Sequence, residues 1–329
     1  MSLRFGLRLL LLSVVVFGIF SAVISNFLDR HIKQEVSRVL RQLHETPGLT
    51  YDIEPTESDS SGAVNLSNCS LKDKKLQYVL EHIELVSFVC LDSVTDLEQF
   101  PSSFGGRAVA DLTLISCEAS QPFEVGCQPL RGLTCYSCSL SKAFLQGESF
   151  SALACLGLVG GQRTDVLMEA VGRIGTLNSL HVEMTDLTDV GLSHLRSLES
   201  LRTVNLKQTH VTDRGLQFLA ANKSIASLDL SGTDIRLPDL QGLKILKHLS
   251  LNHTAVSDLL LPQIRSLAQL ESLNLSNTSI SNLNELGRVP TLKHLYLHGT
   301  RVSDEAISRF RALNPDCKVF TGKDAEYFQ

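Results

Sequence analysis

The sequence predicts an α/β solenoid with a parallel sheet on a concave face and short helices on a convex face, preceded by one N-terminal hydrophobic helix. Two observations support this prediction. Residues 1–28 contain a long run without charged side chains after Arg8. Residues 177–313 contain one pattern six times, in regular copies that begin at Leu177, Leu201, Ile225, Leu246, Leu270 and Leu292.

Each copy contains the signals of a strand followed by a turn and a helix. Positions 4 and 6 are apolar and alternate with polar positions 3, 5 and 7, as Val204 and Leu206 do, which predicts a strand with one buried face. Ser/Thr-Asp at positions 12 and 13 predicts a helix N-cap, and Leu192, Leu195 and Leu198 then recur at helical spacing. One unit cannot bury its apolar residues alone, so stacked copies supply the core.

The pattern LxxLxLxxTxV resembles that of the leucine-rich repeat family. Its Cys/Thr-ladder type is similar to bacterial membrane-anchored repeat proteins and to the repeat domain of F-box leucine-rich-repeat receptors. The resemblance implies a horseshoe with a parallel concave sheet and convex helices. Small residues at position 9 are predicted to form a structural ladder with hydrogen bonds along the stack, and they are Cys69, Cys117, Cys138, Thr185, Thr209, Thr233, Thr254, Thr278 and Thr300.

Degenerate copies in 61–176 precede the regular copies in 177–313. They bring the total to about eleven and begin near Ser61, Leu85, Val109, Leu130 and Leu153. In the copy near Leu85, Ser93 falls at position 9 and Cys90 at buried position 6. Glycines and poor helical spacing between 85 and 153 predict loops or extended segments on the convex side. Residues 314–329 are predicted to be a cap whose short strand contains Cys317, Val319 and Phe320.

Residues 1–28 are predicted to form a single transmembrane helix, because the uncharged run between Arg8 and Asp29 is long enough to cross a bilayer. A cleaved signal peptide is the alternative, although the run exceeds the usual hydrophobic region of such a signal. The segment resembles an export signal, which favours an extracytoplasmic repeat domain, whereas the positive charges that follow it favour the opposite orientation. Residues 29–60 are predicted to be an amphipathic juxtamembrane helix and an acidic linker.

Leucine-rich repeat proteins usually bind ligands on the concave face, at strand positions 3, 5, 7 and 8. Carried over to this chain, the resemblance implies a ligand-binding set that consists of His181, Glu183, Asn205, Lys207, Asp229, His248, Asn252, His253, Asn274, His294, Tyr296 and His298. Tyr296 with His294 and His298 forms an aromatic patch of the kind found at interface hot spots. The alternative is that exposed strand positions are polar whether or not they bind a ligand.

No metal site, cofactor or catalytic site is predicted. Cys135-x-x-Cys138 lacks a second pair of ligands, and His248 and His294 lie two repeats apart, about 10 Å, which is too far to share one ion. A disulfide between Cys117 and Cys138 stays open, because the two residues occupy neighbouring copies. No nucleophile–base arrangement, phosphate loop or paired-carboxylate motif stands out, so we do not expect an enzyme.

Composition and architecture together favour a recognition module. The net charge of −5 and the pI near 6.1 give no reason to expect nucleic-acid binding. We therefore predict a membrane-anchored protein that recognises a protein or an extended polymer through its concave sheet. An intracellular substrate adaptor of the F-box type and a mainly structural envelope protein are the alternatives, and the oligomeric state stays open.

Overall fold

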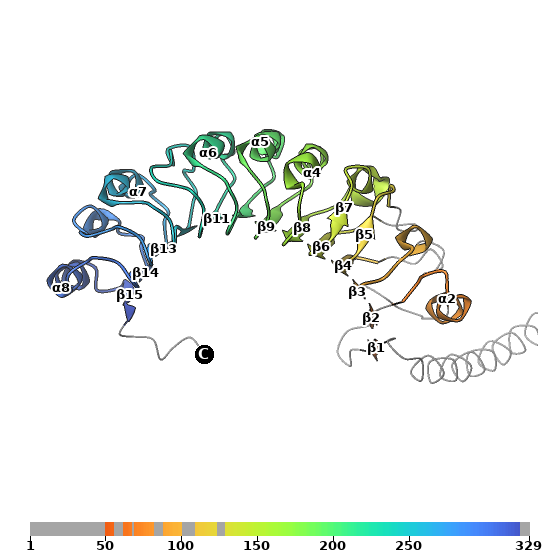
Figure 1. Ribbon diagram of the computed structural model, residues 1–329. Coiled ribbons are helices and arrows are strands. Elements are labelled where there is room, and N and C mark those ends of the chain that lie inside the picture. Colours follow the sequence, from red (N-terminus) through yellow and green to blue (C-terminus); the bar gives the residue numbers. More distant parts are fainter. Residues whose placement is uncertain are drawn as a thin grey trace, which may run out of the picture.

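The computed structural model of the chain describes residues 50–55, 62–67, 69–81, 88–100, 109–123 and 129–322. These residues form an arc whose inner, concave face is a sheet and whose outer, convex face carries the helices (Figure 1). The predicted solenoid is therefore confirmed. Between β1 at one end and β15 at the other, eleven strands pair in parallel, one for each predicted copy.

The concave sheet has 13 strands within the described residues, and in spatial order they are β1 (Thr50–Pro55), β2 (Gly62–Ser67), β3 (Phe88–Asp92), β4 (Asp111–Ile115), β6 (Gly132–Tyr136), β8 (Cys155–Val159), β9 (Ser179–Glu183), β10 (Thr203–Asn205), β11 (Ser227–Asp229), β12 (His248–Ser250), β13 (Ser272–Asn274), β14 (His294–Tyr296) and β15 (Lys318–Phe320). The α-helices are α2 (Lys74–Glu81), α4 (Thr164–Val171), α5 (Asp189–Leu192), α6 (Asp213–Ala220), α7 (Leu261–Arg265) and α8 (Asp304–Leu313). Short 3-10 helices are η1 (Leu97–Gln99), η2 (Phe144–Gln146), η3 (Glu148–Phe150), η4 (Ser193–Ser197), η5 (Asp258–Leu260) and η6 (Leu286–Arg288).

The core runs between the sheet and the helices and is built from the same positions in every copy. In the copy that begins at Leu201, positions 1, 4, 6 and 11 are Leu201, Val204, Leu206 and Val211, and all four are 0 % exposed. Burying an aliphatic side chain of this size contributes about 1.5–3 kcal/mol. Because each neighbour repeats the set, the buried residues form one continuous cluster along the arc.

The copy near Leu85 lies one residue later than the sequence predicted. Strand β3 pairs Val89 with Leu112 and Leu91 with Leu114, and both of its apolar residues are fully buried. Cys90, predicted at a buried position, therefore lies between them on the concave face and is half-buried. Position 9 is Val94 rather than Ser93. Apolar residues at both even and odd positions of Phe88–Asp92 left the register open in the sequence.

In the described residues between 88 and 153 the convex side is irregular, as predicted. It contains η1, η2, η3 and a separate two-stranded parallel sheet of β5 (Glu118–Ala119) and β7 (Ser139–Leu140). Beneath these segments lies a cluster of buried aromatic rings, Phe100, Phe123, Phe144 and Phe150, with neighbouring centroids 5.0–6.2 Å apart. Aromatic packing supplies the core where regular helices are absent from the described residues.

The N-terminal edge differs from the prediction of a flexible connector. Thr50–Pro55, part of the predicted linker, forms β1 and pairs antiparallel with β2, from Thr50 opposite Ser67 to Pro55 opposite Gly62. This pairing covers an edge of the sheet that would otherwise expose backbone groups. The predicted transmembrane helix in 1–28 and the predicted juxtamembrane helix lie outside the described residues. None of the helices that are described is both long and apolar enough to cross a membrane.

The threonines at position 9 form hydrogen bonds within their own copy rather than along the stack. The Thr209 hydroxyl donates to the Leu206 carbonyl at 2.7 Å, and Thr233, Thr254, Thr278 and Thr300 make the same bond to the carbonyl three residues earlier at 2.6–2.8 Å. Here the chain leaves the strand, so this carbonyl needs a local donor. Thr185 is the exception, and its hydroxyl instead accepts from the Leu187 N–H at 3.4 Å.

Replacing Thr254 by valine keeps the shape of the side chain but removes the bond to the Leu251 carbonyl. We expect a loss of about 1 kcal/mol in the free energy of unfolding, the usual net value of one neutral hydrogen bond. Urea unfolding followed by circular dichroism measures it. Thr254→Ser, which keeps the donor, is the control. A Thr254→Val protein as stable as the parent would show that the bond contributes nothing.

The Ser/Thr-Asp pairs cap helices and also join neighbouring copies. Thr188 is the N-cap of α5 and accepts from the Val190 N–H at 3.2 Å, as predicted. The Asp165 carboxylate of the preceding copy extends toward this helix. It accepts from the Thr188 N–H at 2.8 Å, the Thr188 hydroxyl at 2.6 Å and the Gly191 N–H at 3.0 Å. These donors lie at the start of a helix, where N–H groups have no intrahelical partner.

The same inter-copy bridge recurs along the arc. Asp189 accepts from the N–H of Thr212 at 2.8 Å and from its hydroxyl at 2.6 Å. Asp258 makes the equivalent bonds to Ser281, at 2.8 and 2.5 Å. Burial alone would raise the pKa of the Asp258 carboxyl, but the hydrogen bonds from Ser281 and Asn282 outweigh it and lower that pKa. The carboxylates therefore act as links between repeats.

Candidate functional site

The concave face presents three rows of side chains, because positions 3, 5 and 7 of neighbouring strands are in register. In the row of position 3, His248 pairs with Ser272, which pairs with His294, as the two-repeat separation in the sequence predicted. All twelve residues of the predicted ligand-binding set belong to these rows or to position 8 beside them. Lys207, His248, His253 and His298 are exposed, and the other eight members are half-buried.

Three members of the predicted set stabilise their own strand ends. The side-chain oxygens of Asn205, Asp229 and Asn274 accept from the backbone N–H two residues later, at 3.0, 2.8 and 3.0 Å. Asn and Asp commonly form such local turns. Asn or Asp at position 5 therefore stabilises the turn after the strand. The resemblance to ligand-binding proteins predicted only a binding role for these residues.

A polar network spans β9 and β10. The Asn205 amide donates to the Glu183 carboxylate at 2.8 Å, and the His181 ring lies between that carboxylate, 3.9 Å away, and the Ser179 hydroxyl at 2.9 Å. These contacts hold Glu183 and His181 in fixed orientations. The structure thus brings His181, Glu183 and Asn205 together, as their positions in adjacent repeats predicted.

The aromatic patch predicted near the C-terminal end is present and larger than predicted. The Tyr296 and Phe320 rings stack with centroids 4.7 Å apart and planes at 10°, and His294 stacks on Phe320 at 6.3 Å. Phe320 was predicted only as part of the cap, but its pairing with Tyr296 in β14–β15 places it at position 5 of the concave face. His298 lies against Gly322 of the cap.

None of the predicted ligand-binding residues comes from the degenerate copies, and there the structure adds three concave residues. Ile115, Tyr136 and Val159 occupy position 7 of β4, β6 and β8, directly beside one another. Tyr136 is 43 % exposed. The signal was available in the spacing, since all three follow the second buried residue of a strand.

The described cysteines are free thiols, of which Cys117, Cys135, Cys138 and Cys317 are buried and Cys69, Cys90 and Cys155 are half-buried. Cys117 and Cys138 are free, and they neighbour each other as their copies predicted. The hydrogen bond with the Cys138 thiol, followed by burial, raises the pKa of the Cys117 thiol. Burial raises the pKa of the Cys69 thiol to about 11. A protonated thiol is a poor nucleophile and metal ligand. Within the described part of the chain, no three His, Cys, Asp or Glu residues come together as a metal site.

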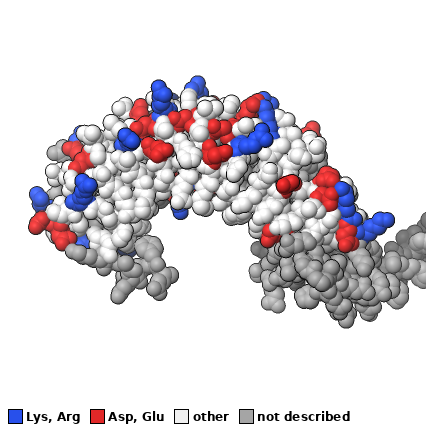
Figure 2. All heavy atoms as spheres, viewed as in Figure 1, with Lys and Arg blue, Asp and Glu red and all other residues white. Residues whose placement is uncertain are grey.

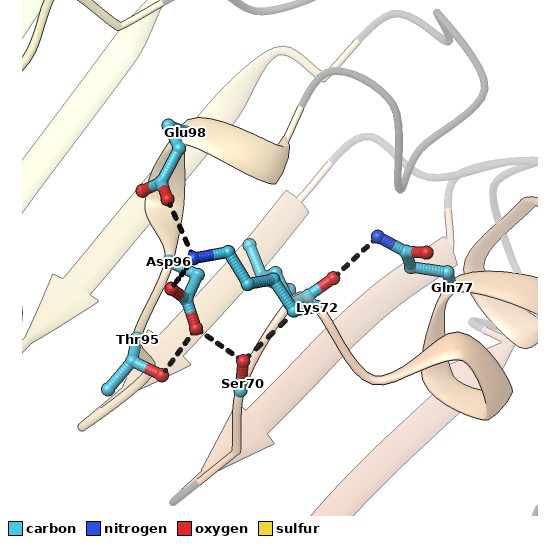
Figure 3. Close-up of polar contacts among 7 residues, drawn as sticks. Ser70, Lys72, Gln77, Thr95, Asp96 and Glu98 are labelled. Atoms are coloured by element: carbon cyan, nitrogen blue, oxygen red, sulfur yellow. Dashed lines mark hydrogen bonds and ion pairs between the residues drawn. The ribbon is translucent and has the colours of Figure 1, made fainter.

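A separate polar cluster joins the first two copies at the flank of the arc (Figure 3). The Lys72 ammonium lies 2.5 Å from the Asp96 carboxylate and 3.4 Å from Glu98. Asp96 also accepts hydrogen bonds from the hydroxyls of Ser70 and Thr95. Because these contacts link Asp96 of the second copy to Ser70 and Lys72 of the first, we assign the cluster a structural role.

The Asp96 carboxyl is expected to titrate near pH 2. The hydrogen bonds from Lys72 and then Ser70 lower its pKa from 3.8 to about 2. Because the folded-state pKa is lowered, the stabilisation is present above the unfolded value and is lost as the pH falls through about 2. Carboxyl carbon shifts in an NMR titration measure the pKa. In Lys72→Met it should rise towards 3.8, and an unchanged value would contradict the assignment.

Charge is distributed unevenly over the two faces. Figure 2 shows Lys, Arg, Asp and Glu mixed along the convex surface, while the inner rim in the same view is mostly uncharged. On the convex surface, residues of both signs are intermixed, and this view shows no extended area of one sign. The concave face instead carries polar, aromatic and apolar side chains in ordered rows.

The comparisons with known proteins agree with this geometry. Residues 197–220 match the family model described as Leucine Rich repeat. An internalin of Listeria monocytogenes is 16% identical over 79% of this chain and 82% of its own, with a TM-score of 0.52. A leucine-rich-repeat protein of Leptospira interrogans is 20% identical over 75% of this chain and 68% of its own, also at 0.52.

The chain is a leucine-rich-repeat protein. A further solved structure, TLR13 in complex with ssRNA13, is 17% identical over 72% of this leucine-rich-repeat chain and 40% of its own, with a TM-score of 0.50. At these identities the likeness shows the fold alone. Among curated proteins, no sequence matches this one.

Proposed function

We propose that this leucine-rich-repeat protein is a recognition module that binds a protein or an extended polymer along its concave sheet, without catalysis. One observation carries the proposal. Large side chains of the concave rows lie outside the core: Lys207, His248 and His298 are exposed, and Tyr296 with Phe320 forms an aromatic surface at the C-terminal end of the same face. Tyrosine is among the residues that are enriched in the hot spots of protein interfaces.

The rigidity of the array supports the same function. Parallel pairing, the buried core and the aspartate bridges fix the spacing of the concave rows before any partner arrives. A surface that is already ordered loses little conformational entropy on binding, so more of the contact energy appears as affinity. The curvature of the arc adds a surface that can follow an elongated partner.

A concave triple variant tests the proposal. Lys207→Ala, His248→Ala and Tyr296→Ala together are expected to lower the affinity for a partner at least tenfold, because each removes a side chain outside the core. We leave Asp229 unchanged, because its carboxylate accepts a hydrogen bond from the Ser231 N–H. Affinity is measured by surface plasmon resonance with the partner that the parent chain enriches from its source. The control replaces exposed Arg214, Gln217 and Lys223 on the convex side by Ala. Equal affinity of the concave triple and the parent would contradict the proposal.

We also propose that residues 1–28 anchor the protein in a membrane, with the repeat domain on the extracytoplasmic side. The uncharged run between Arg8 and Asp29 supports the anchor. Protease added to intact cells or spheroplasts should then digest a C-terminally tagged chain. Protection until the membrane is broken would place the repeats inside the cell.

A further inference from the structure

The N-terminal half of the concave face carries an apolar surface of its own. Ile115, Tyr136 and Val159 stand side by side at the ends of β4, β6 and β8. Tyr136 is 43 % exposed, and the other two are half-buried. We call these three residues the central patch. Five strands, β9 to β13, lie between it and the Tyr296–Phe320 surface, so the two are separate.

A carboxylate follows the central patch at each end of the same row. Asp92 of β3 pairs with Ile115, and Glu183 of β9 pairs with Val159. Neighbouring strands are about 4.8 Å apart, so each carboxylate lies about 10 Å from Tyr136 along the row. Strands β3, β4, β6, β8 and β9 contain no Lys or Arg, and Asp111 adds a third acidic side chain. Within these five strands the row therefore has an aromatic centre, apolar neighbours and acidic ends, and the exposed Lys207 follows Glu183 at position 7 of the next copy.

Hydrogen bonds orient the two carboxylates of this row. Glu183 is oriented by the Asn205 amide at 2.8 Å, and Asp92 accepts from the Ser93 hydroxyl at 2.9 Å. Next to the central patch, position 5 carries only the small residues Thr113, Thr134 and Gly157. Small side chains there leave room for a polypeptide backbone to lie across the strands beside Tyr136.

We propose that the central patch binds an extended segment of another protein that places a large apolar side chain on Tyr136 and a Lys or Arg about three residues to either side. In polyproline II conformation, three residues complete one turn and span about 9 Å, so the apolar side chain and both cations face the sheet at a spacing close to the separation of Tyr136 from Asp92 and from Glu183. The apolar contact removes Ile115, Tyr136 and Val159 from water, and the cationic flanks complement the acidic ends. This inference rests on recognition by the concave face and adds the chemistry of the partner.

Labelled peptides test the proposal with the full chain. The probe is Ser-Lys-Ser-Ser-Leu-Ser-Ser-Lys-Ser, compared with versions that carry Gln or Glu in place of both Lys residues. Fluorescence anisotropy should show at least tenfold tighter binding of the Lys peptide than of the Glu peptide. Tyr136→Ser should lower the affinity at least tenfold, while Tyr136→Phe should retain it. Asp92→Asn combined with Glu183→Gln should abolish the preference for Lys over Glu.

Leu237→Ser is the matched control, because it removes a large apolar side chain that is 45 % exposed, close to the 43 % of Tyr136, and lies outside the concave rows. It should leave peptide binding unchanged. Equal binding of the Lys and Glu peptides, or an equal loss in Tyr136→Ser and Leu237→Ser, would overturn the proposal. Circular dichroism confirms that each variant is folded. If peptides fail to bind while the concave triple variant still loses its partner, this inference falls and the broader recognition function stands.

Discussion

Replacing Gly242 by alanine is expected to cost about 3 kcal/mol of folding free energy, the upper part of the range for overpacked sites. A Cβ on Gly242 would lie 2.8 Å from the carbonyl carbon of Ala220 and 3.1 Å from its Cα, and closer still to its carbonyl oxygen. These are backbone atoms at the end of α6 in the neighbouring copy, so they cannot rotate away. The two copies must separate or the helix end must shift.

Urea unfolding followed by circular dichroism measures this effect, and Gly175→Ala provides the control. No atom lies within 4 Å of a Cβ built on Gly175, which also lies in a turn between copies. Its replacement should leave stability unchanged or raise it slightly, since alanine restricts the unfolded chain. Equal stabilities of the two variants would mean that the close approach of Gly242 to Ala220 does not limit the stacking of repeats.

Asp165→Ala is expected to have a comparable effect, about 3 kcal/mol, through a different mechanism. The carboxylate accepts three hydrogen bonds from the next copy, and its loss leaves the N–H groups of Thr188 and Gly191 without their acceptor. Hydrogen bonds to a charged acceptor contribute about 1.5–3 kcal/mol each, and the liberated groups regain part of this through water. Asp165→Asn should lose less, because its amide oxygen still accepts.

The unfolding transition should also become broader in Asp165→Ala. Repeat arrays unfold cooperatively because neighbouring units stabilise one another, and this variant weakens one such interface. A lower dependence of the unfolding free energy on urea concentration would report the loss of cooperativity. Asp234→Asn, an exposed aspartate in a later copy, serves as the control. Parent-like stability and slope in Asp165→Ala would contradict the role of the carboxylate as a link.

The repeat architecture could be predicted because each of its signals recurs. Leu201, Val204, Leu206 and Val211 have equivalents in every regular copy, so an error in one copy is corrected by its neighbours. The degenerate copies offer no such check. In Phe88–Asp92, apolar residues flank Cys90 on both sides, and only the pairing with β4 decides which face is buried.

The contacts between copies were harder to predict than the copies themselves. Asp165 and Asp189 have the sequence context of helix caps, and nothing local shows that they bond to the following repeat. The same holds for the phenylalanine cluster, although Phe100, Phe123 and Phe144 recur at roughly the repeat period. Such partners lie one repeat apart in sequence, so they become visible only when the copies are stacked.

The candidate site was predicted in part. The alternation of residues along a strand shows which face of the sheet a side chain occupies, but it does not show whether that side chain is free to bind a ligand or forms hydrogen bonds within the protein. His248 and Lys207 are exposed on the concave face as predicted. Asn205, Asp229 and Asn274 lie on the same face, but their side-chain oxygens accept hydrogen bonds from backbone N–H groups. Tyr136 escaped the prediction because its copy is degenerate, and Phe320 escaped it because its strand follows the last full copy.

Labelling of histidines with diethylpyrocarbonate, with and without the bound partner, tests concave recognition most directly. His248 and His298 are exposed on the concave sheet, whereas His194 is exposed in η4 on the convex side. All three histidines should react in the isolated protein. In the complex, we expect the labelling rates of His248 and His298 to fall at least fivefold while that of His194 stays constant. Protection of His194 alone, with unchanged rates at His248 and His298, would place the partner on the convex face and contradict the account.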